Sequence, residues 1–145
     1  MKKNIKVILI LFMTIILTGC TKDYTAISYS KFISEFNDKK DYEIIDKTLI
    51  NEGVYKRSYE AGNGNCTFFY FEFENEKDAN SYMKTNYKDN DSFSYKDEDN
   101  YIIAKTKSLK NYVKIIKVDN TVIIGKSEKF FDRFSINKIY KELGF

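Results

Sequence analysis

The chain has 145 residues, with 24 lysines and arginines against 21 aspartates and glutamates, and it contains no histidine, tryptophan or proline. The lack of histidine excludes a Ser-His-Asp triad, a Cys-His pair and the zinc sites that use imidazole ligands. A formal net charge of only +3 gives no reason to expect a nucleic-acid partner. The length suits one domain with one hydrophobic core.

The first 20 residues have the pattern of a secretory signal. Lys2, Lys3 and Lys6 give a basic start, residues 7–17 are apolar apart from one threonine, and two small residues follow. A membrane-spanning helix needs about 20 apolar residues, and this run has only about 11. We therefore expect a cleaved signal, while an uncleaved membrane helix and an ordinary signal cut elsewhere stay open as alternatives.

Leu17-Thr18-Gly19-Cys20 resembles the lipobox of bacterial lipoproteins, in which a branched apolar residue and two small residues precede a cysteine. The resemblance implies cleavage between Gly19 and Cys20. It also implies a diacylglyceryl thioether on Cys20, with acyl chains such as palmitate. Two acyl chains anchor a protein stably where one holds it weakly. The implied location is the extracytoplasmic face of the cell membrane.

The predicted organisation is a signal peptide over residues 1–19, a lipidated tether over residues 20–27 and a single domain over residues 28–145. Cleavage removes three of the 24 basic residues and none of the 21 acidic ones, so the mature chain has no net side-chain charge. With Cys20 lipidated, Cys66 has no partner for an internal disulfide. We expect Cys66 to fill an apolar position.

The first half of the domain reads as one helix followed by three strands. Residues 28–37 repeat apolar side chains at helical spacing and begin with serines that can cap a helix. Strands are predicted over residues 42–50, 54–60 and 66–74. In the last of these, Phe69, Phe71 and Phe73 point one way, and we expect that face to form the core. The opposite face is apolar at first and acidic at its end, as in a half-covered antiparallel sheet.

The second half begins with a helix capped by Asn75, which carries acidic residues near its positive end. Further strands are predicted over residues 93–95, 101–106, 112–118 and 122–126. A last helix is predicted over residues 135–143, with Gly144 as a left-handed cap and Phe145 folded back on the helix end. The aromatic residues at 130–134 either extend this helix or form a separate turn.

The predicted fold class is α+β, a two-layer sandwich in which about three helices pack on one face of an antiparallel sheet of about five or six strands. The strand over residues 112–118 is apolar on both faces. We therefore expect a partner or a second copy, as in a homodimer, to cover the other face. The segments 118–123 and 143–145 resemble uncharacterised small exported proteins of low-GC bacteria, a resemblance that transfers no site.

An acidic run offers one candidate site. Glu72 and Glu74 would lie on one strand face about 6.5–7 Å apart, which overlaps the separation of paired carboxylates in glycosidases. The alternative is a solvated strand end followed by a helix start that carries Glu76 and Asp78. We favour this second interpretation, because a hydrolase also needs a cleft and sugar-binding platforms.

Three other candidates have competing explanations. Five acidic residues resemble a calcium loop but lack its turn glycine, so a solvated loop is expected: Asp89, Asp91, Asp97, Glu98 and Asp99. Cys66 lacks a histidine to activate it as a nucleophile. Three tyrosines on an outer sheet face would make a binding surface, although core packing is the better expectation: Tyr70, Tyr101 and Tyr112.

The sequence therefore predicts a lipid-anchored extracytoplasmic domain without cofactor or metal. It predicts a non-enzymatic domain that binds a protein partner at the membrane surface. Two other functions remain open. One is binding or hydrolysis of envelope glycans through strand carboxylates. The other is a phage-type exclusion or immunity role, which also requires binding to a membrane protein.

Overall fold

The computed structural model describes residues 23–51 and 53–145. The predicted signal peptide, Gly19 and Cys20 lie outside these residues. The helices of the described part are α2 (Tyr29–Asn37), α3 (Glu76–Met83), a π-helical turn (Lys84–Lys88), a 3-10 turn (Phe130–Asp132) and α4 (Arg133–Leu143). The strands are β1 (Glu43–Asp46), β2 (Arg57–Gly62), β3 (Thr67–Glu72), β4 (Phe93–Asp97), β5 (Tyr101–Thr106), β6 (Tyr112–Val118) and β7 (Thr121–Ser127).

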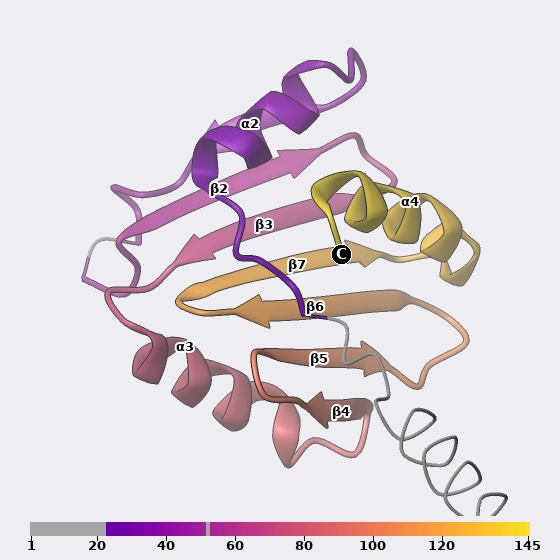
Figure 1. Ribbon diagram of the computed structural model, residues 1–145. Coiled ribbons are helices and arrows are strands. Elements are labelled where there is room, and N and C mark those ends of the chain that lie inside the picture. The colour runs from indigo at the N-terminus through magenta and orange to yellow at the C-terminus, as the bar shows by residue number, and fades with distance from the viewer. Residues whose placement is uncertain (1–22, 52) are drawn as a thin grey trace, which may run out of the picture.

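All seven strands form one antiparallel sheet in the order β1-β2-β3-β7-β6-β5-β4 (Figure 1). The strands β1–β3 and β4–β7 form two meanders, and the pairing of β3 with β7 joins them. This confirms the predicted α+β class with helices packed on an antiparallel sheet. The sheet has one or two more strands than expected, because each short segment between turns pairs with a neighbour.

We had expected the helices to pack on one face of the sheet, but they cover both faces. In Figure 1, α2 and α4 lie in front of the sheet. Phe68 and Ile123 pack beneath these two helices. Ile115 and Val122 point to the other face, where they pack with Met83 of α3. The central strands are therefore apolar on both faces because helices of this same chain cover both.

The predicted core face of β3 needs correction. Phe69 and Phe71 are only partly buried, whereas Phe68 and Tyr70 on the opposite face are 0% and 1% exposed. Phe73 is buried as expected. The difference arises because Phe36 of α2 and Tyr140 of α4 both pack on Phe68, while α3 packs over the neighbouring strands β6 and β7.

Helix α4 packs tightly on the sheet through Tyr140. Its hydroxyl is completely buried, 2.6 Å from the carbonyl oxygen of Lys114 and 2.9 Å from that of Ile123. Gly144 has a φ of 105°, which confirms the left-handed cap, and the backbone N–H of Phe145 donates to the carbonyl of Tyr140. The aromatic residues before the helix resolve into a 3-10 turn, and Phe134 belongs to α4 itself.

Two element boundaries differ from the prediction. The strand predicted over residues 42–50 ends at Asp46, because the Asp46 carboxylate accepts a hydrogen bond from the N–H of Thr48 and turns the chain. Residues 47–51 and 53–56 form a looped segment instead of strand ends. The strand predicted over residues 54–60 begins instead at Arg57 and ends at Gly62.

Asn75 caps α3 as predicted, and its removal should be measurable. The Asn75 side chain accepts from the N–H of Asp78 at 3.0 Å and donates to the Asp78 carboxylate at 2.9 Å. We expect Asn75→Ala to lower the free energy of unfolding by about 1 kcal/mol in urea titrations. The control is Ser81→Ala on the exposed surface of the same helix, which should leave stability unchanged or slightly raised. Equal losses from both variants would contradict the capping role.

Candidate functional site

The first described residues are fixed to the domain. The carbonyl oxygen of Tyr24 accepts a hydrogen bond from Asn100 at 2.8 Å, and the Tyr24 ring packs edge-on against Tyr101 and Phe145. Ile27 is buried in the core beneath α2 and α4. Within the predicted tether, the chain is therefore held at the domain surface from Tyr24 onward.

The acidic run does not assemble a pair of free carboxylates. Both oxygens of Glu72 are engaged, one 3.2 Å from Lys56 and the other 2.9 Å from Arg57. Glu74 lies beyond the end of β3 and is exposed. The two glutamates do not share the regular strand on which their predicted spacing depended.

The rest of the acidic run serves the start of α3. Asp78 is the capping partner of Asn75, and Glu76 lies 2.6 Å from the ammonium of Lys117. Lys117 projects from β6 with only 3% of its side chain exposed. Its hydrogen bond holds the pKa of Glu76 below the ordinary value. These contacts agree with the helix-start interpretation of the run.

Cys66 and the three candidate tyrosines are parts of the core. Burial raises the pKa of the Cys66 thiol to about 11, so the thiolate is scarce at neutral pH. Tyr70, Tyr101 and Tyr112 are 1%, 9% and 7% exposed. The hypothesis of an outer tyrosine surface is wrong, and the alternative of core packing is confirmed. The covering elements are α2, α4 and the N-terminal residues, and the Tyr70 hydroxyl donates to the carbonyl of Ile27.

The acidic loop residues do not form a metal centre in the described part of the chain, where no three acidic or cysteine residues are grouped to hold an ion. Glu98 pairs instead with Lys96 at 2.7 Å. Among the same described residues, no helix has the length and apolar character needed to cross a membrane.

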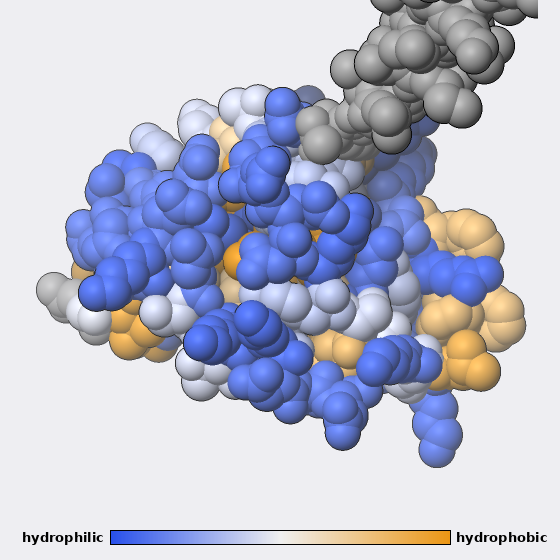
Figure 2. Space-filling view, turned by 60° about the horizontal axis from the view of Figure 1, so that its bottom comes forward, coloured by the Kyte–Doolittle hydropathy of each residue, from blue (hydrophilic) through white to orange (hydrophobic). Residues whose placement is uncertain are grey.

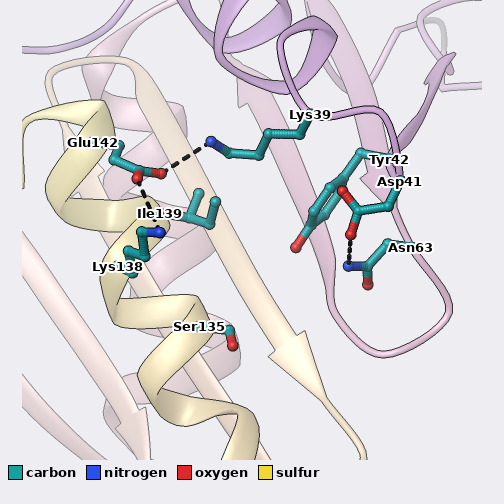
Figure 3. A pocket seen from close by; sticks show the side chains of 8 residues that line it. All are labelled: Lys39, Asp41, Tyr42, Asn63, Ser135, Lys138, Ile139 and Glu142. Carbon is teal, nitrogen blue, oxygen red and sulfur yellow. Dashed lines mark hydrogen bonds and ion pairs between the residues drawn. The ribbon is translucent and has the colours of Figure 1, made fainter.

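A polar hollow of about 300 Å³ lies between the end of α2 and the exposed side of α4 (Figure 3). Lys39 bridges Glu35 at 2.8 Å and Glu142 at 3.1 Å across the helices. On the other wall, Asn63 donates to the carboxylate of Asp41. The charge of Lys39 is thus matched by two glutamates, while the Asp41 carboxylate is held by a neutral amide.

The same hollow lacks the parts of a catalytic site. Burial raises the pKa of Tyr42 to about 12, so its hydroxyl stays protonated at neutral pH. Ser135 and Lys138 both line the hollow from α4, but Lys138 is directed to Glu142, at 3.9 Å, and makes no hydrogen bond with Ser135. No activated nucleophile results from this arrangement of the lining residues.

A second hollow, which we call the β2–β3 hollow, has a different character. It has a volume of about 250 Å³ and lies on the sheet face opposite α2 and α4. Aromatic rings form much of it: Phe69 and Phe71 are nearly parallel at 6.0 Å, and Tyr55 stacks on Phe71 at 4.4 Å. Its remaining lining residues are Lys47, Ile50, Asn51, Ser58 and Glu60.

The looped segment beside this hollow exposes large aliphatic side chains. Leu49, Ile50 and Val54 are 87%, 75% and 63% exposed. Apolar surface is visible at this left-hand end of the molecule in Figure 2. The nearby cations are neutralised, since Lys47 pairs with Glu60 at 3.8 Å and Lys56 with Glu72 at 3.2 Å. The surface around the hollow is therefore apolar and close to neutral.

The chain matches no protein-family model, no curated protein and no solved structure. Its function is therefore inferred from its own residues and geometry.

Sequence reasoning missed the β2–β3 hollow for an identifiable reason. Ile50 and Val54 were assigned to the ends of two predicted strands, where a sheet would have buried them. The signal that places Ile50 in a loop and not in a strand is the short turn at Asp46 and Thr48, which ends β1 early. With that turn recognised, an aliphatic pair at positions 49 and 50 in a loop indicates exposed apolar surface.

Proposed function

We propose that this protein is a lipid-anchored extracytoplasmic domain that binds an apolar segment of a protein partner at the membrane surface. The observation that carries the binding role is the exposed set Leu49, Ile50 and Val54 beside the aromatic β2–β3 hollow. The anchor rests on the resemblance of residues 17–20 to a lipobox.

The physical argument concerns the chemistry of the ligand. Contiguous exposed apolar surface beside a concave site is typical of interaction surfaces. Burying one large aliphatic side chain contributes about 1.5–3 kcal/mol. Three such residues beside the stacked aromatic rings of the hollow can therefore support a specific complex. Since the lysines around the hollow are already paired with glutamates, a neutral peptide segment fits better than an anionic ligand.

The anchor is tested by fractionation. We expect Cys20→Ala to move the protein from the membrane fraction to the soluble fraction of expressing cells. The matched control is Cys66→Ala, which removes the buried cysteine and should leave the protein on the membrane. Membrane retention of the Cys20 variant would refute lipid anchoring.

The binding role is tested by photo-crosslinking on intact cells that carry the lipidated protein. A photoreactive residue at position 50 should give one dominant protein adduct, identified by mass spectrometry. The same residue at position 92, an exposed position outside this surface, is the control. Leu49→Asp should abolish the adduct at position 50 and Ser92→Asp should not.

The same experiment separates the other candidate functions. An adduct with a second copy of the chain would make the hollow a homodimer interface, whereas an adduct with a phage-directed membrane target would favour the exclusion role. Retention on purified cell wall with no protein adduct would contradict the proposed partner and favour a glycan ligand. Within the glycan alternative, hydrolysis by Glu72 is less well supported than binding, because both carboxylate oxygens of Glu72 are engaged by cations.

A further inference from the structure

A second apolar surface, which we call the aromatic tip, consists of Leu109, Phe130, Phe131, Arg133 and Phe134. Three of these side chains are strongly exposed: Leu109 by 79%, Phe131 by 83% and Phe134 by 66%. The N–H of Phe130 donates to the carbonyl of Lys110 at 3.1 Å, which holds the β5–β6 connection against the turn before α4. Figure 2 shows apolar surface at this right-hand end of the molecule.

The aromatic tip differs from the β2–β3 hollow in its charge. Four cations belong to its segments, Lys107, Lys110, Lys129 and Arg133, and none of them pairs with an acidic side chain of the described residues. Arg133 stacks on the rings of Phe130 at 4.5 Å and Phe134 at 4.8 Å.

Only two acidic residues lie in the same segments. They are Glu128 and Asp132, and Asp132 accepts a hydrogen bond from Ser127. The tip therefore combines bulky apolar groups with an excess of unneutralised positive charge. That combination matches the surface of an anionic bilayer, which presents phosphates above an apolar interior.

The position of the tip relative to the anchor supports the same target. Tyr24 contacts Phe145 just after the C-terminal end of α4, and the tip lies at the N-terminal end of that helix. Eleven residues of helix span about 16 Å at 1.5 Å per residue. Cys20 lies four residue steps before Tyr24, so the two are at most about 13–14 Å apart. The two ends of α4 can therefore approach one membrane plane together.

We propose that the aromatic tip is a second membrane contact, which inserts Phe131 and Phe134 into the interfacial region of an anionic lipid bilayer while the four cations bind lipid phosphates. This rests on the proposed function for the anchor at Cys20. The contact lays α4 along the membrane. It turns the β2–β3 hollow, on the opposite face of the sheet, toward the partner in the aqueous space.

The absence of tryptophan from the chain allows a direct test. The mature lipidated protein is prepared with Phe131→Trp, and the matched control carries Leu49→Trp, at a position of similar exposure in the opposite patch. Both are reconstituted in vesicles of phosphatidylcholine with phosphatidylglycerol and in vesicles of phosphatidylcholine alone. Flotation reports the anchor, and tryptophan fluorescence reports the tip.

We expect Trp emission at position 131 to shift to shorter wavelength in anionic vesicles and to be quenched several-fold by brominated lipids. The control at position 49 should stay accessible to aqueous acrylamide. Adding Arg133→Glu or Lys110→Glu to the Phe131→Trp protein should reduce the quenching by lipid. Arg133→Glu leaves the fold intact, since a carboxylate is favourable in the first turn of a helix.

Three results have separate meanings. If the protein does not float with the vesicles, the lipid anchor is refuted. The Trp emission at position 131 with added anionic vesicles still shows whether the tip contacts lipid. Equal accessibility of positions 131 and 49 to acrylamide in anionic vesicles overturns the membrane contact. An emission shift that appears without vesicles and grows with protein concentration also overturns it, because a second copy then covers the tip.

Discussion

Gly125→Ala is expected to lower the free energy of unfolding by about 1–3 kcal/mol. Gly125 lies on β7 beneath α4. A Cβ atom there would come within 2.8 Å of the Phe68 ring, 3.0 Å of Ile136 and 3.1 Å of the Tyr140 ring. All three neighbours are completely or almost completely buried, so none can move without disturbing the core. The effect is steric, since the backbone of Gly125 needs no positive φ.

The measurement is urea unfolding of the variant beside a second glycine substitution. Gly62→Ala, on β2 of the same sheet, is the matched control. Its added Cβ would meet only Thr67 and Cys66 atoms at 3.7 Å or more, an ordinary van der Waals contact. We expect little change from the control. If Gly125→Ala were equally neutral, α4 would be packed less closely on the sheet than the structure has it.

Glu76→Ala is expected to destabilise the protein by about 1–3 kcal/mol, because it leaves the buried ammonium of Lys117 without its carboxylate partner. The matched control is Glu74→Ala, two residues earlier, which is exposed and makes no ion pair with another described residue. Lys117→Met removes the buried charge itself and should be close to neutral or stabilising. A loss from Glu74→Ala as large as that from Glu76→Ala would contradict the pairing.

The same pair predicts a pH dependence. Lys117 lowers the pKa of Glu76 in the folded state below its ordinary value near 4.5. The pair therefore contributes its full stability above that ordinary pKa, and the contribution is lost as the pH falls through the lowered folded-state pKa. The difference in unfolding free energy between the parent protein and Glu76→Ala should be constant near neutral pH and should shrink in acid.

The elements that could be predicted from sequence are those whose signals are local. The strand over residues 101–106 has its predicted bounds, and the hairpin that follows turns at Asp119, whose φ is 50°. Asn75 caps α3 and Gly144 ends α4 through contacts within a few residues. Such turns and caps depend on the side chains at the turn itself, so one sequence is enough to read them.

The covering of the sheet faces depends on distant contacts and was only partly predicted. β3 pairs with β7, far along the chain, which places Phe68 beneath α4 as well as α2. The sequence of β3 has aromatic residues on both faces and does not distinguish them. Alternation therefore gave the correct strand, while the degree of burial of each face depended on which helix packs above it.

The candidate site was less predictable than the fold. Charge patterns alone singled out Glu72, but its two cationic partners come from the start of β2 and were not identified. The β2–β3 hollow and the aromatic tip both depend on apolar residues that the sequence could assign equally well to a core. Phe131 and Leu49 are exposed because the strands beside them end before they can cover these side chains. Where those strands end is defined only once the sheet is assembled.

The pairing of β3 with β7 also sets the order in which this protein can fold. Because a chain is synthesised from its N-terminus, β1–β3 are made well before β7. Until β7 is made, β3 presents an unpaired aromatic edge, the kind of strand edge that aggregates readily. The interval between the synthesis of β3 and that of β7 is therefore when this edge is most open to aggregation and to proteolysis.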